Sequence, residues 1–326
     1  MSDAPSVTIV RGDRPNLHGR FDGAGGPVAW LESGALVSFR DCPDVGWGLE
    51  PPTSSTAPRR KVEGRVPPRD DGPCLCGPVG VREAEPGAAI EITIQQFHTT
   101  DGGWTYAGRG VTPPGLAQRL GVIDEPLRVL RWSIDHARGA AIERAGTRVP
   151  LRPFPGCLGL ASADPHADGW TPRATGGNMD CPELVPGTSL WLPVEVPGAM
   201  LSIGDGHAAQ GEGELSGTAI ECGIARADLR VTLHKGLHLR GPRIRTPGAW
   251  ITLGFGRTLD EAAAEAACSM LDMMAADLSI ERGEALALAS SRASLRITQM
   301  VNPLVGVHAI LRDQPSTPVR GEAESG

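Results

Sequence analysis

The side chains best suited to chemistry lie close together between Gly176 and Glu221. Carboxylates and a histidine held by tight turns between strands are typical of a divalent metal site. A buried group of carboxylates with no cation would repel itself and stay partly protonated. Either these side chains face water, or a metal ion binds among them. They are Asp180, Glu183, Glu195, Asp205, His207, Glu212, Glu214 and Glu221.

A glycine-rich stretch inside this region, GDGHAAQGEGE at 204–214, predicts how some of these side chains point. Glycine allows positive φ and a close approach of the backbone to a bound group. Asp205 and His207 are two residues apart, so on an extended segment both leave the same face. Glu212 and Glu214 have the same spacing, and we expect them to share a face as well.

Taken singly, these residues also have structural interpretations. Asp205 is typical of a plain turn, His207 of a surface or core histidine, and Glu212 of a solvated turn. Cys181 and Cys222 each follow an acidic residue, but cysteine is most often a small buried hydrophobic residue. The combination therefore favours a functional site more strongly than any one of its members.

The order of motifs in this region resembles that of a known family. GGNMD at 176–180 is followed by a strand ending in LPV, by GDGHAAQGEGE and by AIE at 219–221. This series resembles the signature of the acetamidase/formamidase family, metal-dependent amidases that hydrolyse small carboxamides to a carboxylate and ammonia. The resemblance extends over nearly the whole chain, through weaker matches in the family's order at 18–41, 77–94, 153–163 and 295–311.

Three positions depart from the family pattern. Ala88 stands where the family usually has Asp after AEPG, and Glu212 gives GEGE in place of GDGE. Pro73, followed by Cys74 and Cys76, occupies a position where a histidine is common. The resemblance thus implies an amidase, while formamide or acetamide as the substrate does not follow from it.

We predict roles for six residues on this basis. A bound Zn²⁺-like ion would polarise an amide carbonyl and lower the pKa of bound water towards ~7. Oxygen-rich ligand sets also bind Ca²⁺ or Mn²⁺. Glu214 is the candidate general base and acid, because a poor nitrogen leaving group needs a proton. Asn178 either hydrogen-bonds the oxyanion or is a turn residue that tolerates the left-handed conformation. The predicted metal ligands are Asp180, Asp205, His207 and Glu221.

The sequence leaves three functions open. The first is metal-dependent hydrolysis of a small linear carboxamide to carboxylate and ammonia. The second is a non-catalytic β-protein whose carboxylates hold a structural metal ion. The third is a hydrolase of the same fold that acts on another C–N bond, for example in an imide or a carbamate-like compound.

Composition narrows the class of protein further. Gly 43 and Pro 29 in 326 residues favour strands and turns over long helices. A net charge of −7 with 4% aromatic residues argues against nucleic-acid or anionic-membrane partners. The partner that the family resemblance implies is a small-molecule amide. Neither a span of ~18–20 apolar residues nor a signal peptide is visible. Seven cysteines fit reduced thiols, so we expect a cytoplasmic protein.

The expected fold is mainly β, because strand runs at close intervals with turn signals suggest β-sandwich-like units. The family resemblance implies jelly-roll-like units with a small C-terminal α/β portion. We expect an N-terminal β-rich domain at 1–150, with a loop insertion at about 50–73 near the site. A second β-rich domain at 151–312 carries the metal motif and two helices, and 313–326 forms a disordered tail. The family resemblance also implies a homodimer or a higher homo-oligomer.

Several elements are specific enough to predict by position. Residues 128–134 and 140–145 are expected to pair as a hairpin. Thr258 and Glu261 form a capping box that begins a helix, and a second helix is expected from Ser279 to about Ala289. The first helix has an apolar stripe at helical spacing, so we expect its methionines to be core residues. The stripe consists of Leu259, Ala263, Ala267, Met270, Met274 and Leu278.

Overall fold

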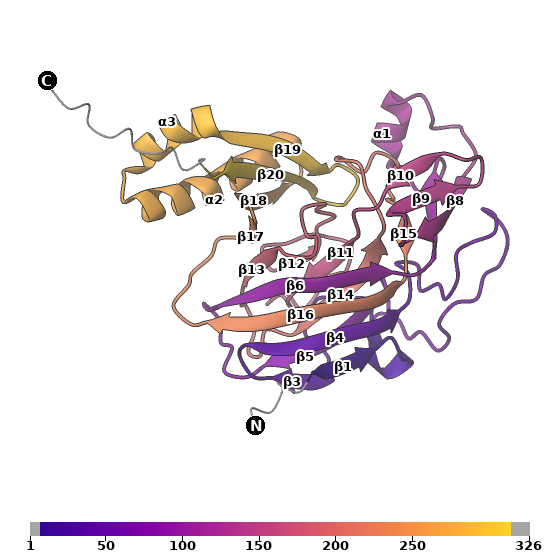
Figure 1. Ribbon diagram of the computed structural model, residues 1–326, viewed down its shortest axis with the longest axis horizontal. Coiled ribbons are helices and arrows are strands. Elements are labelled where there is room, and N and C mark those ends of the chain that lie inside the picture. The colour runs from indigo at the N-terminus through magenta and orange to yellow at the C-terminus, as the bar shows by residue number, and fades with distance from the viewer. Residues whose placement is uncertain (1–6, 314–326) are drawn as a thin grey trace, which may run out of the picture.

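The computed structural model describes residues 7–313, and its described part is dominated by two large β-sheets (Figure 1). Among the named strands in residues 7–313, all pairs are antiparallel except for two parallel pairs, β1 with β4 and β3 with β5. The first sheet has nine strands in the order β1 (Thr8–Arg11), β4 (Ala35–Cys42), β16 (Ile224–His234), β6 (Ala89–Thr99), β13 (Ser189–Pro193), β17 (Arg243–Thr246), β18 (Ala249–Gly256), β20 (Val305–Arg312) and β19 (Ala293–Gln299).

The second sheet carries most of the residues predicted to form the site. Its central strand β14 also pairs with β5 (Leu75–Val81), which in turn pairs with β2 (Leu17–His18) and β3 (Ala29–Leu31). The main order of this sheet is β10 (Arg148–Pro150), β9 (Ala140–Glu143), β8 (Arg128–Asp135), β7 (Gly102–Ala107), β15 (Glu221–Cys222), β14 (Leu201–His207), β11 (Phe154–Gly159) and β12 (Gly176–Asn178).

The main hydrophobic core joins the two sheets. It includes Phe39 and Ile92 from the first sheet and Leu158 and Ile203 from the second, all fully buried. Each such side chain contributes about 1.5–3 kcal/mol of burial free energy. Buried and less buried side chains alternate along much of β6, as expected of a strand with one face in the core. The mainly β fold class is therefore confirmed.

Helices form only a small part of the described chain. They are the 3₁₀ turn η1 (Arg14–Asn16), α1 (Pro114–Arg119), α2 (Leu259–Leu278) and α3 (Arg282–Arg292). Figure 1 shows α2 and α3 beside β18, β19 and β20 at one end of the molecule, which confirms the expected C-terminal α/β portion. None of the helices in the described part of the chain is long and apolar enough to cross a membrane.

The first helix begins where the capping box predicts. The backbone N–H of Glu261 donates to Thr258 Oγ1 at 3.2 Å, and the Glu261 carboxylate accepts from the N–H of Arg257 at 2.7 Å. The second helix begins three residues later than expected. Ser279 has a left-handed φ of 54° and caps the end of α2, so it cannot open α3.

One further expectation about the C-terminal portion needs correction. The apolar face of α2 is centred on Ala262, Ala266 and Met270, whereas Leu278 is 47% exposed. The buried face is thus rotated by one residue, although the methionines are core residues as expected. The 295–311 segment is two antiparallel strands, β19 and β20, joined by a turn.

The predicted hairpin at 128–145 is present, since β8 pairs with β9 in an antiparallel register. Both sheets draw strands from either side of residue 150, and the expected domain division there stays a prediction. Apart from Asp313, the expected C-terminal tail lies outside the described residues.

Candidate active site

Five ionisable side chains from the predicted set meet at the end of β14. Asp205 and His207 belong to β14, Glu221 lies opposite His207 in β15, and Asp180 is the second residue after the end of β12. Glu214 comes from the turn between β14 and β15. All five are at most 6% exposed. The expectation that Asp205 and His207 point the same way is confirmed, because Asp205 Oδ1 lies 3.1 Å from His207 Nε2.

The backbone at this site adopts conformations that residues other than glycine seldom use. Asp180, Asp205 and Glu214 have φ values of 49°, 58° and 49°, all in the left-handed region. Such conformations cluster at functional sites, because the surrounding structure must hold them in place. The glycines that flank these residues in the sequence were a signal for this geometry.

Gln210 orients the imidazole of His207. Its side-chain N–H₂ donates to the backbone carbonyl of Asp180 at 2.8 Å, so its Oε1 is left to accept from His207 Nδ1 at 3.0 Å. The proton of a neutral His207 then lies on Nδ1, and the lone pair of Nε2 faces Asp205 Oδ1 and Glu221 Oε2 at 3.1 and 3.3 Å. This is how polar neighbours orient metal-ligating histidines.

Four buried polar atoms of the cluster lack a hydrogen-bond partner. They are Asp180 Oδ1, Asp205 Oδ1, His207 Nε2 and Glu221 Oε2. Buried polar atoms are normally paired, so a group of unpaired atoms points to a bound species. Moreover, a Cβ on Gly156 would lie 2.5 Å from Asp205 Oδ2 and 2.9 Å from Asp180 Oδ1. The residues present therefore fit a divalent cation.

The electrostatics of the cluster agree with this interpretation. Burial, and then the charge of Asp205 against the opposing effect of His207, raises the pKa of Asp180 to about 7 and that of Glu221 to about 8. Burial, followed by the charge of Asp180, raises the pKa of Glu214 well above its usual range. Carboxylates crowded in this way stay partly protonated unless a cation joins them.

The four carboxylates of the cluster, but not His207, line a cavity of about 410 Å³. Its aromatic walls are Trp104, Tyr106 and Trp170, and its polar floor includes Asn178 and Asn302. Among the residues that the structure describes, no lysine or arginine lines it. An uncharged organic molecule and a cation suit such a cavity better than an anion does.

Asn178 lies in β12 with ordinary backbone geometry, so its interpretation as a left-handed turn residue is wrong. Its Oδ1 accepts from the thiol of Cys157 at 2.8 Å. Its Nδ2 makes a long contact of 3.4 Å with the carbonyl of Trp170 and lines the cavity. The Asn178 amide is thus held from both sides beside Asp180.

The sequence did not identify Asn302, which donates to Asp180 Oδ2 at 2.6 Å and to the carbonyl of Asn178 at 3.1 Å. Gln299 Oε1 accepts from the N–H groups of Val301 and Asn302, both at 3.0 Å, and so fixes this turn. Nothing in the local sequence signals this role, because the β19–β20 turn reaches the site only in the folded chain. Gln210 could have been found, since it follows His207 by three residues.

Other acidic residues of the motif lie outside the cluster. Glu212 is exposed and pairs with Arg296 at 2.7 Å, while Glu214 is buried, so the expectation that they share a face is wrong. The reason is the turn at Gly213, whose N–H donates to the carbonyl of Thr298 and reverses the direction of the chain. The two remaining acids, Glu183 and Glu195, pair with Arg152 and with Ser162, respectively.

The cysteines behave as buried apolar residues. Cys181 and Cys222 are at most 1% exposed, and burial raises the pKa of the Cys181 thiol to about 12 and that of Cys222 still further. Neither thiol is available as a nucleophile near neutral pH. The departures at Pro73 and Ala88 also lie outside the lining of the site cavity.

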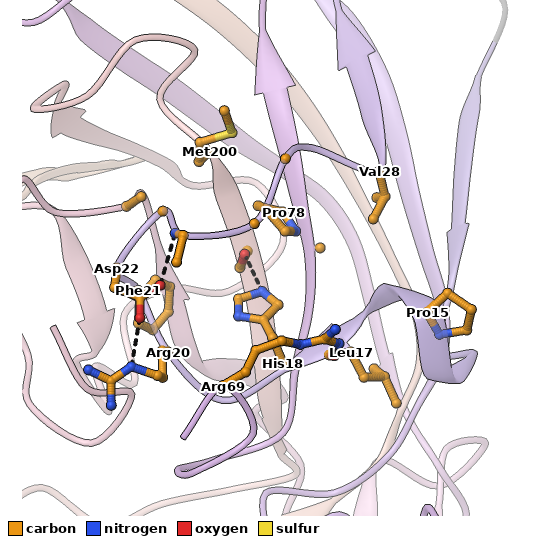
Figure 2. A pocket seen from close by; sticks show the side chains of 17 residues that line it. Pro15, Leu17, His18, Arg20, Phe21, Asp22, Val28, Arg69, Pro78 and Met200 are labelled. Carbon is orange, nitrogen blue, oxygen red and sulfur yellow. Dashed lines mark hydrogen bonds and ion pairs between the residues drawn. The ribbon is translucent and has the colours of Figure 1, made fainter. Parts of the chain in front are cut away.

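A second cavity, of about 290 Å³, is lined by residues that include His18 of β2, Pro78 of β5 and Ser202 of β14 (Figure 2). There His18 Nε2 and Ser202 Oγ are hydrogen-bonded at 2.9 Å, and Arg20 pairs with Asp22. Burial lowers the pKa of His18 to about 4, so its imidazole is neutral at pH 7. None of the six residues predicted for the site lines this cavity.

Comparisons with known proteins agree with these observations. Residues 166–251 match the model of the Acetamidase/Formamidase family, a range that contains all six predicted site residues. The acetamidase of Mycolicibacterium smegmatis is 30% identical over 230 residues, which cover 51% of this chain and 55% of that protein. A putative formamidase of Schizosaccharomyces pombe is 58% identical over 41 residues. The chain thus spans about half the length of the Mycolicibacterium protein.

Solved structures resemble the chain over more of its length. The acetamidase from Bacillus halodurans superimposes with a TM-score of 0.81 and 28% identity, covering 93% of this chain and 97% of that one. The acetamidase from Yersinia enterocolitica gives 0.80 and 26%, with 95% and 93% covered. The gamma lactamase from Delftia acidovorans shares the fold at a TM-score of 0.60 and 20% identity. In its motif and its fold, this chain is therefore similar to members of the acetamidase/formamidase family.

Proposed function

We propose that the protein hydrolyses the C–N bond of a small linear carboxamide and releases the carboxylate and ammonia, with the help of a divalent metal ion. The observation that carries this proposal is the buried cluster of four carboxylates and one imidazole, with four unpaired polar atoms at the end of an aromatic cavity. Similarity to the acetamidase/formamidase family supports amide hydrolysis in general.

Asp180, Asp205, His207 and Glu221 would hold the ion. Asp180, Asp205 and His207 offer ligand atoms within 4.8 Å of one another, and Glu221 forms a second such group with His207 and Glu214. A divalent ion bound there supplies Lewis-acid chemistry to an amide carbonyl and to water. A mixed set of imidazole and carboxylates favours Zn²⁺, and its oxygen-rich composition also accepts Ca²⁺ or Mn²⁺.

We assign general base and general acid catalysis to Glu214. It is 6% exposed, lines the cavity and lies beside Asp180, and burial and the charge of Asp180 raise its pKa against the opposing effect of His207. In amide hydrolysis a general base takes a proton from the attacking water and then gives one to the departing nitrogen. We assign both steps to the Glu214 carboxyl.

Asn178 and Asn302 are placed to orient the reacting groups. The Asn178 amide has one N–H directed at the Trp170 carbonyl and lines the cavity, so its other N–H is free for a substrate oxygen. Asn302 holds the Asp180 carboxylate, and Gln210 holds the His207 ring. Trp104, Tyr106 and Trp170 exclude water from the space that the acyl group would occupy.

The size of the cavity also allows a second class of substrate. A volume of about 410 Å³ falls within the ~300–1,000 Å³ that proteins use for small organic ligands. It leaves room for an acyl group larger than acetyl, or for another C–N compound such as an imide or carbamate-like molecule.

Ammonia release across a panel of amides, imides and carbamates, together with elemental analysis, tests the proposal. We expect one divalent ion per site, ammonia from at least one linear amide, and loss of activity with a chelator. Bound metal without ammonia release from any compound would support a non-catalytic protein with a structural ion. Absence of bound metal, with activity indifferent to chelators, would contradict the metal-dependent mechanism.

A further inference from the structure

Three side chains connect the 50–73 segment with the wall of the site cavity. Trp104 lines the cavity and lies opposite Glu221 in the sheet. Its indole N–H donates to Asp44 Oδ2 at 2.9 Å. Arg59, from the 50–73 segment, binds both carboxylate oxygens of Asp44, and its guanidinium carbon lies 5.2 Å from the centre of the Trp104 ring. Arg59 therefore contacts Trp104 both directly and through Asp44.

This group is removed from solvent. The side chains of Arg59 and Asp44 are 9% and 4% exposed, and Trp104 is 4% exposed. A charge pair in such surroundings is strongly coupled, because loss of one partner leaves the other buried without compensation. The indole is held by a hydrogen bond to a carboxylate and by a stacked cation, both stronger than contacts between neutral groups.

The backbone around Asp44 leaves space for the guanidinium group of Arg59. Asp44 Oδ1 accepts from the N–H groups of Gly46 and Gly48 at 3.0 and 2.8 Å. A Cβ on Gly46 would lie 2.6 Å from Arg59 Nη2, and one on Gly48 would overlap Arg59. Arg59 also donates to the carbonyl of Glu50 at 3.1 Å. The two glycines thus leave the space that Arg59 fills.

The indole is one half of an aromatic wall. The rings of Trp104 and Tyr106 lie 4.4 Å apart at an angle of 43°, and both line the cavity. Because Trp104 and Glu221 are cross-strand partners, this wall stands directly beside the carboxylate cluster. A shift of the indole would change the space available to a substrate without removing any of the proposed ligands.

We propose that Arg59 is a positioning residue that fixes the Trp104 wall and thereby sets which acyl groups the site accepts. The inference rests on the proposed amide hydrolysis. It gives the 50–73 segment a role in specificity, although no residue of that segment lines the site cavity. Arginine suits this position better than lysine, because only its planar fork can bind a carboxylate with two bonds while it stacks on a ring.

The test compares wild type with Arg59→Lys on formamide, acetamide, propionamide and butyramide. We expect kcat/KM for the preferred amide to fall roughly 10- to 100-fold, the scale of a small misplacement. The loss should come mainly from KM, and the order of preference among the four amides should change, with metal content unaltered. An equal loss of kcat/KM for every amide would show a merely structural role and overturn the inference.

Arg245→Lys is a matched control. Arg245 also stacks on an indole, at 5.2 Å from the centre of the Trp250 ring, and pairs with Asp313 at 2.7 Å. Neither Arg245 nor Trp250 lines the site cavity. We expect this variant to keep the wild-type order of amide preference. A change of preference as large as that of Arg59→Lys would overturn the inference.

A second readout separates failure of the inference from failure of the proposed function. In protein labelled with 5-fluorotryptophan, the ¹⁹F resonance of Trp104 is assigned with Trp104→Phe. Arg59→Lys should shift or broaden that resonance and leave the Trp250 resonance in place. If wild type hydrolyses none of the four amides, the proposed function fails. The Trp104 resonance alone then tests whether Arg59 positions Trp104. An unchanged Trp104 resonance would overturn the inference.

Should Arg59→Lys fail to fold, the double variant Asp44→Asn with Arg59→Gln removes both charges of the pair together and avoids a lone buried charge. The same change of amide preference and of the Trp104 resonance is expected. Wild-type preference and an unaltered resonance in this double variant would overturn the inference.

Discussion

Asp205 and His207 leave one short stretch of β14 and meet at 3.1 Å, as their two-residue spacing in an extended segment predicts. The same argument failed for Glu212 and Glu214, because Gly213 reverses the chain between them. Residue spacing therefore predicts convergence only where the segment is a strand. The sequence indicates a strand before the first pair and a glycine turn at the second.

The first prediction concerns the proposed metal ligands. Asp205→Ala and His207→Ala should each abolish metal binding, because each removes a buried donor from the cluster. Elemental analysis and ammonia release measure the loss, and an unchanged circular dichroism spectrum shows that the fold survives. His234→Ala is the control: His234 pairs with Glu91 outside the cavity, and we expect wild-type metal content. Full turnover in both ligand variants would show that the segment containing Asp205 and His207 is only a structural turn.

The second prediction concerns Glu214. Glu214→Gln keeps the shape and a hydrogen bond but removes the titratable group, so metal content should persist while kcat falls roughly 10²-fold or more. The acidic limb of the pH–rate profile should also change. Loss of metal in this variant would make Glu214 a ligand instead. An unchanged rate with unchanged metal content would place it outside the chemistry.

At the scale of elements, the sequence predicts those with strong local signals. The capping box begins α2 at the predicted residue, and the β8–β9 hairpin lies within a few residues of its expected bounds. The end of α2 was misjudged because Ser279, which is not glycine, takes the left-handed C-terminal position. Asn302 was missed for a different reason, since its role depends on a turn that meets Asp180 only through tertiary structure.

The third prediction concerns the contact between α2 and the first sheet. A Cβ on Gly254 in β18 would overlap the backbone of Ala262 and Ala266, so the helix packs directly on this glycine. Gly254→Ala should push α2 outward and lower the free energy of unfolding by about 1–3 kcal/mol, the usual cost of overpacking. Urea unfolding measures this loss.

Gly248→Ala supplies the control for that measurement. Nothing lies within 4 Å of a Cβ at Gly248, so this variant should match or slightly exceed wild type in stability. Equal stability of the two variants would show that α2 does not depend on a close approach at Gly254.

At the scale of the whole molecule, the site draws on segments that lie far apart in the chain. The second sheet supplies the carboxylates, the 50–73 segment supports Trp104, and the β19–β20 turn brings Asn302 to Asp180. The sequence predicted the acidic residues because they share one motif. The sequence could not predict the residues that hold the site in place, such as Arg59 and Asn302, because they lie far from this motif along the chain. Homo-oligomer formation and a cytoplasmic location stay predictions.

The last prediction concerns acid stability and rests on His308, which is fully buried in β20. Burial lowers the pKa of its imidazole to about 4, outweighing the opposing charges of Glu183 and Glu212, while Arg296 and Arg152 lower it further. In the unfolded chain the pKa is ~6.5. Between about pH 6.5 and 4 the unfolded chain therefore binds a proton that the folded protein does not.

Stability should accordingly fall as the pH drops through this window, by up to roughly 3 kcal/mol for this group, and the loss should end below about pH 4. Carboxylates titrate in the same range, so the informative quantity is the difference between wild type and His308→Gln. Gln does not titrate and keeps a hydrogen-bonding group for Thr298, the partner of His308 Nδ1 at 2.8 Å. Urea unfolding at pH 4.5 and 7.5 should show a smaller pH dependence in His308→Gln. An identical pH dependence in the two proteins would mean that His308 becomes protonated in the folded state as readily as in the unfolded chain.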